Sequence, residues 1–124
     1  MKAIRVSIED FDKTIKEQVV GDNKVFVLFF GTEMPETSES WCPDCVIADP
    51  VVRKAVSSVS NSVLIEAAVG LRNDWKGNTT HPYRVRFNVP AIPTLYKWTA
   101  NGPGERLVEE ECADSAKLEA FVQN

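Results

Sequence analysis

Two cysteines three residues apart, Cys42 and Cys45, form the pattern that most directly suggests chemistry. A polar segment precedes the motif Cys42-Pro43-Asp44-Cys45 and helical spacing follows it, which places both thiols on the first turn of a helix. The unpaired N–H groups and partial positive charge of a helix N-terminus favour a thiolate at Cys42. Because a thiolate attacks disulfides, the motif predicts exchange in which Cys42 attacks a substrate and Cys45 releases the reduced product.

The same cysteine spacing has two other interpretations. A Cys-x-x-Cys pair begins many zinc sites, which need about two further ligands. Only Cys112 and His81 remain, so a Cys₃His site is arithmetically possible, although neither has the close pair spacing of a zinc finger. Two inert thiols are the other alternative. We expect no metal, a structural thiol at Cys112, and a surface or capping role for His81.

Composition limits the class of protein. The chain has 124 residues, 44% of them hydrophobic, and a net charge of −4. This length fits one domain spanning residues 1–124. The negative charge argues against general binding to nucleic acid, and no apolar run approaches the ~20 residues of a membrane span. An odd cysteine count without a signal peptide favours a reducing compartment, so we expect a cytosolic protein.

Apolar runs and turn signals predict an α/β sandwich. Strands are expected at residues 3–6, 25–30, 63–69, 93–98 and 105–109, the last two joined by a turn at 101–104. Helices are expected from Ser7 to before Gly21, from Pro43 to about Ser58 with a kink at Pro50, and from about Ser115 onward. The apolar set of the second helix is Val46, Ile47, Val51, Val52 and Val59. Residues 71–88 suggest short helical or irregular pieces.

Several of these residues together resemble the thioredoxin family. A buried strand precedes Trp41-Cys42-Pro43-Asp44-Cys45, Pro50 lies five residues beyond the second cysteine, and Ile92-Pro93-Thr94 opens a later strand. The pentapeptide and the long loop before it resemble the branch of thioredoxin-related proteins of fourteen kilodaltons (thioredoxin domain-containing protein seventeen) and Clot-type proteins. The resemblance covers nearly the whole chain and implies a thioredoxin fold, with a central mixed sheet flanked by helices on both faces.

The resemblance also implies a function. Members of this branch are cytosolic disulfide reductases that bind no cofactor and receive electrons from NADPH through thioredoxin reductase. Their substrates are small disulfides such as cystine and a narrow set of proteins, with possible activity on nitrosothiols, persulfides and peroxides. By the same resemblance Pro93 is a cis-proline opposite the motif that leaves the backbone of Ile92 free to pair with substrate. Trp41 is expected to be a half-exposed platform beside the nucleophile, with ordinary packing as the alternative, and the protein is expected to be a monomer.

Two acids are candidates for tuning the motif. Asp44 favours the helix N-terminus but opposes a neighbouring thiolate, so with Pro43 it should tune the redox potential. Many thioredoxins have a buried aspartate that takes the proton of the resolving thiol, and the corresponding residue here is Leu28. Our hypothesis is that Asp49, on the same helical face as Cys45, or Asp44 accepts that proton instead.

The segment from Gly31 to Val52 contains five acidic residues and no Lys or Arg. It predicts either an acidic active-site face that prefers basic disulfides at low salt, or simply a solvated loop.

Two functional alternatives remain. A glutaredoxin would use glutathione, but the Gly-Gly segment that glutaredoxins use to hold it is missing. A redox-gated binding module would hold a signalling partner without turnover.

Overall fold

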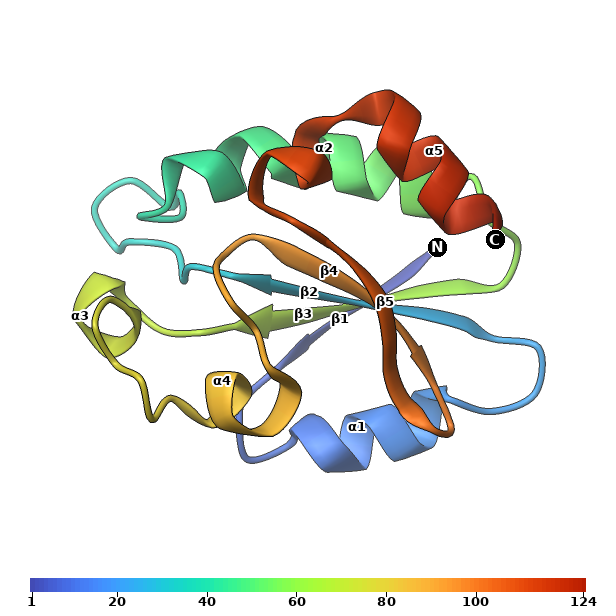
Figure 1. The fold of residues 1–124 in the computed structure, drawn as a ribbon, viewed down its shortest axis with the longest axis horizontal. Helices are drawn as coiled ribbons and strands as arrows, with labels where there is room; N and C mark the ends of the chain where they lie inside the picture. The colour runs from blue at the N-terminus through green and yellow to red at the C-terminus, as the bar shows by residue number, and fades with distance from the viewer.

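The computed structural model describes residues 1–124 and contains one five-stranded sheet (Figure 1). Its strands are β1 (Lys2–Val6), β2 (Lys24–Phe30), β3 (Ser62–Ala68), β4 (Thr94–Thr99) and β5 (Gly102–Val108). The spatial order is β1-β3-β2-β4-β5, in which β1, β3 and β2 are parallel, β4 is antiparallel to β2, and β5 is antiparallel to β4. The mixed sheet of the predicted α/β class is confirmed.

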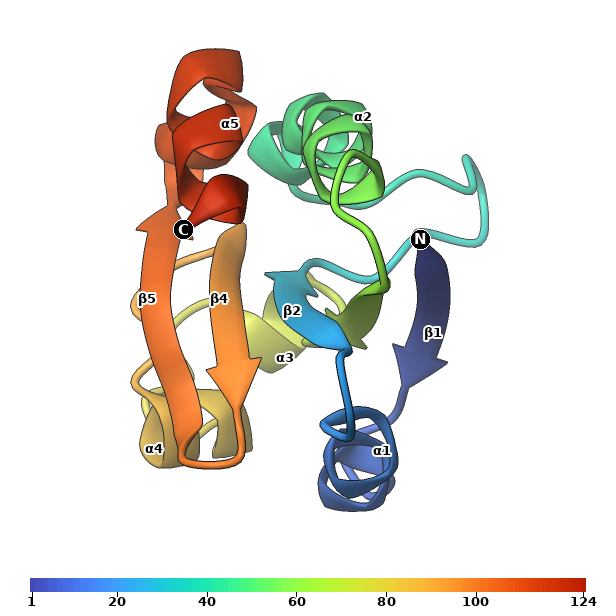
Figure 2. The same cartoon turned by 90° about the vertical axis from the view of Figure 1, so that its right-hand side faces the viewer.

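Helices cover both faces of the sheet (Figures 1 and 2). One face carries α1 (Phe11–Gln18), α3 (Arg72–Trp75) and α4 (Pro82–Phe87). The other carries α2 (Pro43–Ser57), the 3₁₀ helix η1 (Glu109–Ala113) and α5 (Ser115–Gln123). None of these helices has the length and apolar character needed to cross a membrane.

The central strand β2 explains why its sequence is a continuous apolar run. A strand covered on both faces buries every side chain, so the polar alternation of a half-exposed strand is absent. Toward α1 and α4, the Phe29 ring packs 4.9 Å from that of Tyr83, which packs 5.3 Å from that of Phe11. Val52 of α2 and Leu118 of α5 are fully buried as well. The two layers therefore pack against β2 from both sides and fix its end, from which the chain runs to the cysteine motif.

Three local predictions are wrong. The first helix begins at Phe11 rather than Ser7, because the Ser7 hydroxyl accepts the N–H of Asp10 and donates to its carboxylate, closing a turn before the helix. The predicted turn at 101–104 shifts, because Thr99 pairs with Gly102 and residues 102–104 already belong to β5. Two residues assigned to the buried set of the second helix, Val46 and Ile47, are 37% and 59% exposed.

The remaining boundaries agree closely with the predictions. Helix α2 starts at Pro43, ends at Ser57 and continues through Pro50. The region 71–88 contains two short helices, α3 and α4, as its mixed pattern indicated. The Asp114 carboxylate accepts the N–H of Lys117 and so caps α5.

Candidate active site

The cysteine motif lies at the junction of the loop after β2 with helix α2. Cys42 is the N-cap residue, with extended backbone, and its sulfur accepts the N–H of Cys45 at 3.3 Å. Pro43 occupies the first helical position, where its missing N–H costs nothing. The Cys45 thiol donates to the Cys42 sulfur across 2.6 Å. The predicted placement of two adjacent sulfurs on the first turn is therefore confirmed.

The two thiols are electrostatically unequal. The hydrogen bond from the Cys45 thiol is the largest influence on Cys42 and lowers its pKa; the Cys45 N–H acts in the same direction, while burial opposes both. The same thiol pair, together with burial, raises the pKa of Cys45 far above the ordinary range. Cys42 is thus suited to be the nucleophile and Cys45 the thiol that reacts second.

Asp44 has a definite electrostatic effect on Cys42. Its exposed carboxylate raises the pKa of Cys42, partly cancelling the effect of the neighbouring N–H groups. We therefore expect Asp44→Asn to lower that pKa and to increase the thiolate fraction at pH 6. Since an exposed charge interaction is worth up to about 1 kcal/mol, alkylation of Cys42 at pH 6 should become about two- to fivefold faster. The pH dependence of iodoacetamide labelling measures this.

The control for this prediction is Glu36→Gln, which removes an exposed acid elsewhere in the same loop. It should leave the labelling profile of Cys42 unchanged. A profile that moved equally in both variants would mean that the overall charge of the loop, rather than Asp44, sets the reactivity.

The Ile92–Pro93 segment lies directly beside the nucleophile. The peptide bond between the two residues is cis, as the family resemblance implied, and the Ile92 carbonyl oxygen is 3.9 Å from the Cys42 sulfur. The Pro93 carbonyl accepts the N–H of Glu109 at 2.7 Å and lies 3.7 Å from the Cys112 sulfur. Helix η1 therefore fixes the Ile92–Pro93 segment against the motif. The substrate-binding role of this segment stays a prediction.

Trp41 is half-buried, and its ring is fixed in place. The indole N–H donates to the Gly70 carbonyl at 2.8 Å, and the ring covers the backbone of Gly31 so closely that no side chain fits there. Trp41 also forms one wall of a groove that opens beside Cys42. Packing therefore accounts for the orientation of Trp41, and its function as a platform for substrate stays a prediction.

A groove of about 300 Å³ opens beside Cys42. Its walls carry charges of both signs: Lys76 and Arg84 are cationic, and Asp44 and Glu109 are anionic. The Arg84 guanidinium lies 3.6 Å above the Trp75 ring and donates to the Trp75 and Pro90 carbonyls, so its charge has a fixed position. Neither cation lies within the acidic segment 31–52, and both were missed in the sequence.

A second cavity, of about 210 Å³, lies beside Cys45. Only one of the two candidate proton acceptors lines it. Asp49, Ser40 and Arg53 line it together with Cys45, whereas Asp44 lines the groove at Cys42. Of the two acids, only Asp49 shares a cavity with Cys45, and its role as the proton acceptor stays a prediction.

A chain of ion pairs changes the charge expected for this surface. Glu33 and Glu66 flank Arg5 at 2.7 and 3.2 Å, while Glu66 and Asp49 flank Arg53 at 2.7 and 3.0 Å. The hydrogen bond from Arg5 lowers the pKa of Glu33. Two of the five acids in the segment 31–52 are thus paired with arginines from outside it, so the predicted acidic face exists only in part.

Comparison with known proteins identifies the family. Residues 5–124 match the family model described as "Thioredoxin domain-containing protein 17-like, thioredoxin domain". The chain belongs to this family. It is 35% identical to thioredoxin domain-containing protein 17 of Mus musculus over 92% of this chain and 88% of the relative. It is also 35% identical to the thioredoxin-like protein Clot of Arabidopsis thaliana, over 85% and 81% of the two chains.

Solved structures confirm the thioredoxin fold. Thioredoxin NaTrxh of Nicotiana alata superimposes with a TM-score of 0.70 over 98% of this chain and 90% of its own, at 18% identity. Membership of this thioredoxin-like family, with two adjacent thiols at a helix N-terminus, makes the protein a thiol–disulfide oxidoreductase in general terms.

The other two titratable residues considered as zinc ligands have structural roles in this family member. His81 is buried, not at the surface; it caps α4, with Nδ1 accepting the N–H of Tyr83 and Nε2 2.8 Å from the Val69 carbonyl. Cys112 is fully buried, 3.3 Å from the Leu107 carbonyl, and burial raises its pKa to about 12. No three His, Cys, Asp or Glu side chains are grouped as metal ligands, so a Cys₃His site has no geometric basis.

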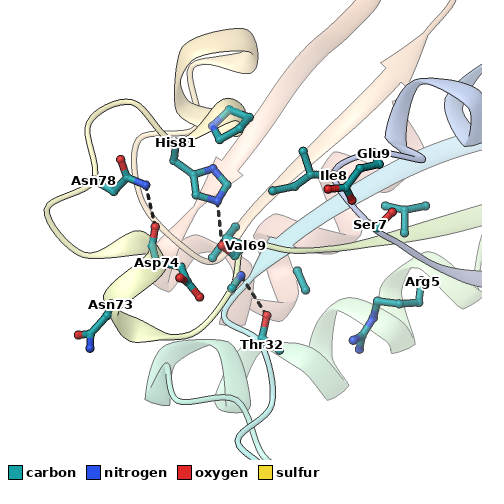
Figure 3. A pocket seen from close by; sticks show the side chains of 14 residues that line it. Arg5, Ser7, Ile8, Glu9, Thr32, Val69, Asn73, Asp74, Asn78 and His81 are labelled. Carbon is teal, nitrogen blue, oxygen red and sulfur yellow. Dashed lines mark hydrogen bonds between the residues drawn. The ribbon is translucent and has the colours of Figure 1, made fainter.

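The largest cavity of this thioredoxin-like domain is a separate polar hollow of about 680 Å³ (Figure 3). It lies where β1 and β3 end and contains none of the motif residues. Several of its polar groups already have partners within the protein, as Figure 3 shows for His81 with the Val69 carbonyl and for Asn78 with the Asp74 carbonyl. The groove at Cys42 and the cavity at Cys45, rather than this hollow, define the candidate active site.

Proposed function

We propose that this protein is a disulfide reductase that is recharged by thioredoxin reductase with electrons from NADPH. It acts in the cytosol as a monomer, on small disulfides such as cystine and on a restricted set of proteins. The observation that carries the proposal is the arrangement of the two thiols at the start of α2: the Cys42 sulfur accepts hydrogen bonds from both the N–H and the thiol of Cys45, which lowers the pKa of Cys42 and raises that of Cys45. A reductase needs this order, one thiol ready to attack and one held back.

The first step consumes the Cys42 thiolate. Its sulfur attacks one sulfur of the substrate disulfide, forming a Cys42–substrate bond and expelling the other half of the substrate as a thiolate. The Cys45 N–H, 3.3 Å from the Cys42 sulfur, stabilises the attacking species. The contact between the Ile92 oxygen and that sulfur supports the proposal that the backbone of Ile92 pairs with an extended substrate.

The second step releases the product. Cys45 loses its proton, its sulfur attacks Cys42, a Cys42–Cys45 disulfide forms, and the bound half of the substrate leaves as a thiolate. Asp49 is the proposed proton acceptor, reached through the cavity that it shares with Cys45. Asp49→Asn should therefore slow this step, whereas Asp44→Asn should not. Thioredoxin reductase then returns two electrons and restores both thiols.

The charges of both signs in the groove beside Cys42 favour a zwitterionic substrate. Cystine carries an ammonium and a carboxylate near its disulfide, and the groove offers Lys76 and Arg84 to the carboxylate and Asp44 and Glu109 to the ammonium. We expect Lys76→Glu to reduce kcat/KM for cystine by about fivefold at low salt, since an exposed charge contributes up to about 1 kcal/mol. The difference should shrink at high salt, because salt screens exposed charges.

Lys24→Glu is the matched control for Lys76→Glu, since it reverses an exposed charge at the start of β2, away from the groove. Cystine reduction, coupled to NADPH through thioredoxin reductase, is compared for the two variants across ionic strength. Equal losses in both would remove the groove from the explanation of substrate preference.

The test of the proposed function uses Cys45→Ser. This variant can make the mixed disulfide through Cys42 but cannot resolve it, so it should accumulate covalent adducts with its targets. The expected adducts, separated without reductant and identified by mass spectrometry, contain cysteine, glutathione or a few proteins. The native chain should reduce cystine with NADPH and thioredoxin reductase. Reduction supported equally by glutathione alone would instead indicate a glutaredoxin, and adducts absent from Cys45→Ser would contradict the proposal.

A further inference from the structure

The resolving thiol faces a physical difficulty in this protein. Cys45 is 4% exposed, and burial disfavours the thiolate that it must become. The β2 side chains that line its cavity, Leu28 and Phe30, have no polar atom. A transient thiolate at Cys45 therefore needs hydrogen-bond donors from elsewhere in the structure.

Ser40 is the neighbouring side chain with a donor to spare. Its Oγ accepts the N–H of Cys42 at 3.1 Å, so the hydroxyl proton remains available for the Cys45 sulfur. Ser40 and Cys45 line the same cavity of about 210 Å³. The bridge between Glu33 and Ser40 fixes the backbone of Ser40, so the hydroxyl has a defined position beside the motif.

Gly31 provides a second donor on the same side. Residue 31 follows the last residue of β2, and its N–H makes no backbone hydrogen bond. The Ser40 Oγ lies only 3.0 Å from where a Cβ on Gly31 would stand, so the hydroxyl lies against residue 31, whose N–H acts on Cys45. A serine hydroxyl and a backbone N–H side by side form a small site for an anion such as a thiolate.

We propose that the Ser40 hydroxyl, together with the Gly31 N–H, stabilises the Cys45 thiolate as it attacks the mixed disulfide. Hydrogen bonds from both groups act to lower the pKa of Cys45, against the larger upward effects of Cys42 and burial. The proposal rests on the proposed function, since it concerns its second step. In that step the Cys45 proton passes to Asp49 through the shared cavity, the Cys45–Cys42 bond forms and the Cys42–substrate bond breaks, so that the substrate leaves as a thiolate.

An aromatic disulfide that releases a coloured thiolate separates the two steps in one stopped-flow trace. Attack by Cys42 releases the first coloured thiolate, and attack by Cys45 on the resulting mixed disulfide releases the second. In Ser40→Ala, we expect the second phase to slow by about tenfold or more relative to the first, because a hydrogen bond to a charged group is lost. The pH profile of the second phase should move to higher pH.

Three further variants keep the interpretation specific. Ser40→Thr retains the hydroxyl and should restore most of the second-phase rate, while Ser40→Gly lacks it and should behave like Ser40→Ala. Ser38→Ala removes a hydroxyl from the same cavity that accepts no N–H from the motif, and should leave both phases unchanged.

The outcomes are distinguishable. A second phase that is unchanged in Ser40→Ala would overturn the proposal. A second phase slowed only as much as the first would also overturn it, because Ser40 would then merely hold the Cys42 backbone. A native chain that shows no first phase would instead contradict the proposed function itself, because Cys42 would then be unreactive.

Discussion

Replacing Cys42 with serine should abolish disulfide reduction by this protein. A serine hydroxyl stays protonated near neutral pH, so the helix N-terminus and the Cys45 hydrogen bonds have no thiolate to stabilise. Loss of a nucleophile that forms the covalent intermediate commonly costs about 10³-fold or more in kcat. The measurement is cystine reduction with NADPH and thioredoxin reductase, in which Cys42→Ser should match the rate without enzyme.

Cys112→Ser is the matched control, because it removes a thiol that is fully buried behind the Ile92–Pro93 segment and has no exposed surface for a substrate to reach. Its kcat should stay close to that of the native chain, with any loss appearing in stability. Residual turnover by Cys42→Ser well above background would mean that another thiol can initiate exchange, contrary to the order of reactivity assigned to Cys42 and Cys45.

Gly31→Ala should damage both the stability of the fold and the second step of the reaction. A Cβ at residue 31 would stand 2.8 Å from two ring atoms of Trp41 and 3.0 Å from the Ser40 Oγ. The Trp41 ring cannot retreat without losing its hydrogen bond to the Gly70 carbonyl. Overpacking of this kind typically costs about 1–3 kcal/mol of unfolding free energy. Urea unfolding measures this cost, and the two-phase exchange assay measures the effect on Cys45.

Gly104→Ala is an informative control for Gly31→Ala. Both glycines lack a positive φ, so the backbone tolerates alanine at either position. The new Cβ at residue 104 would meet only the Lys97 carbonyl, at an ordinary 3.5 Å. A loss for Gly31→Ala no larger than that for Gly104→Ala would show that Trp41 moves aside freely and is not a fixed wall of the site.

The sequence predicted the motif and the fold for identifiable physical reasons. Cys42, Cys45 and Pro43 act through neighbours on a single helical turn, so their geometry follows from local spacing. The buried strand β2 was recognisable because burial on both faces leaves a continuous apolar run. Family resemblance, rather than periodicity, indicated the role of Pro93.

What the sequence could not predict depends on contacts between distant segments. Arg5 and Arg53 neutralise Glu33 and Asp49 from outside the acidic segment, so the local charge count overstated the acidity of the surface. Val46 and Ile47 fit an apolar helical pattern, yet they lie outside the faces of α2 that the sheet and α5 cover.

The most important side chain that was missed is Ser40. It occupies an unremarkable place in a polar loop, and its relation to Cys45 arises only when the end of β2 and the start of α2 meet. The one available signal was its proximity to Cys42, two residues away, which suits a side-chain bond to the Cys42 N–H.

The complete burial of Cys112 gives the protein an intrinsic reporter of global unfolding. With no exposed surface and a pKa raised to about 12, this thiol cannot react with a label while the domain stays closed. Once Cys42 and Cys45 are joined as a disulfide, the rate of labelling at Cys112 equals the rate at which closed molecules open, multiplied by the chance of capture before reclosure. Chemical modification of one native atom can thus follow the kinetic stability of the oxidised domain without any engineered probe.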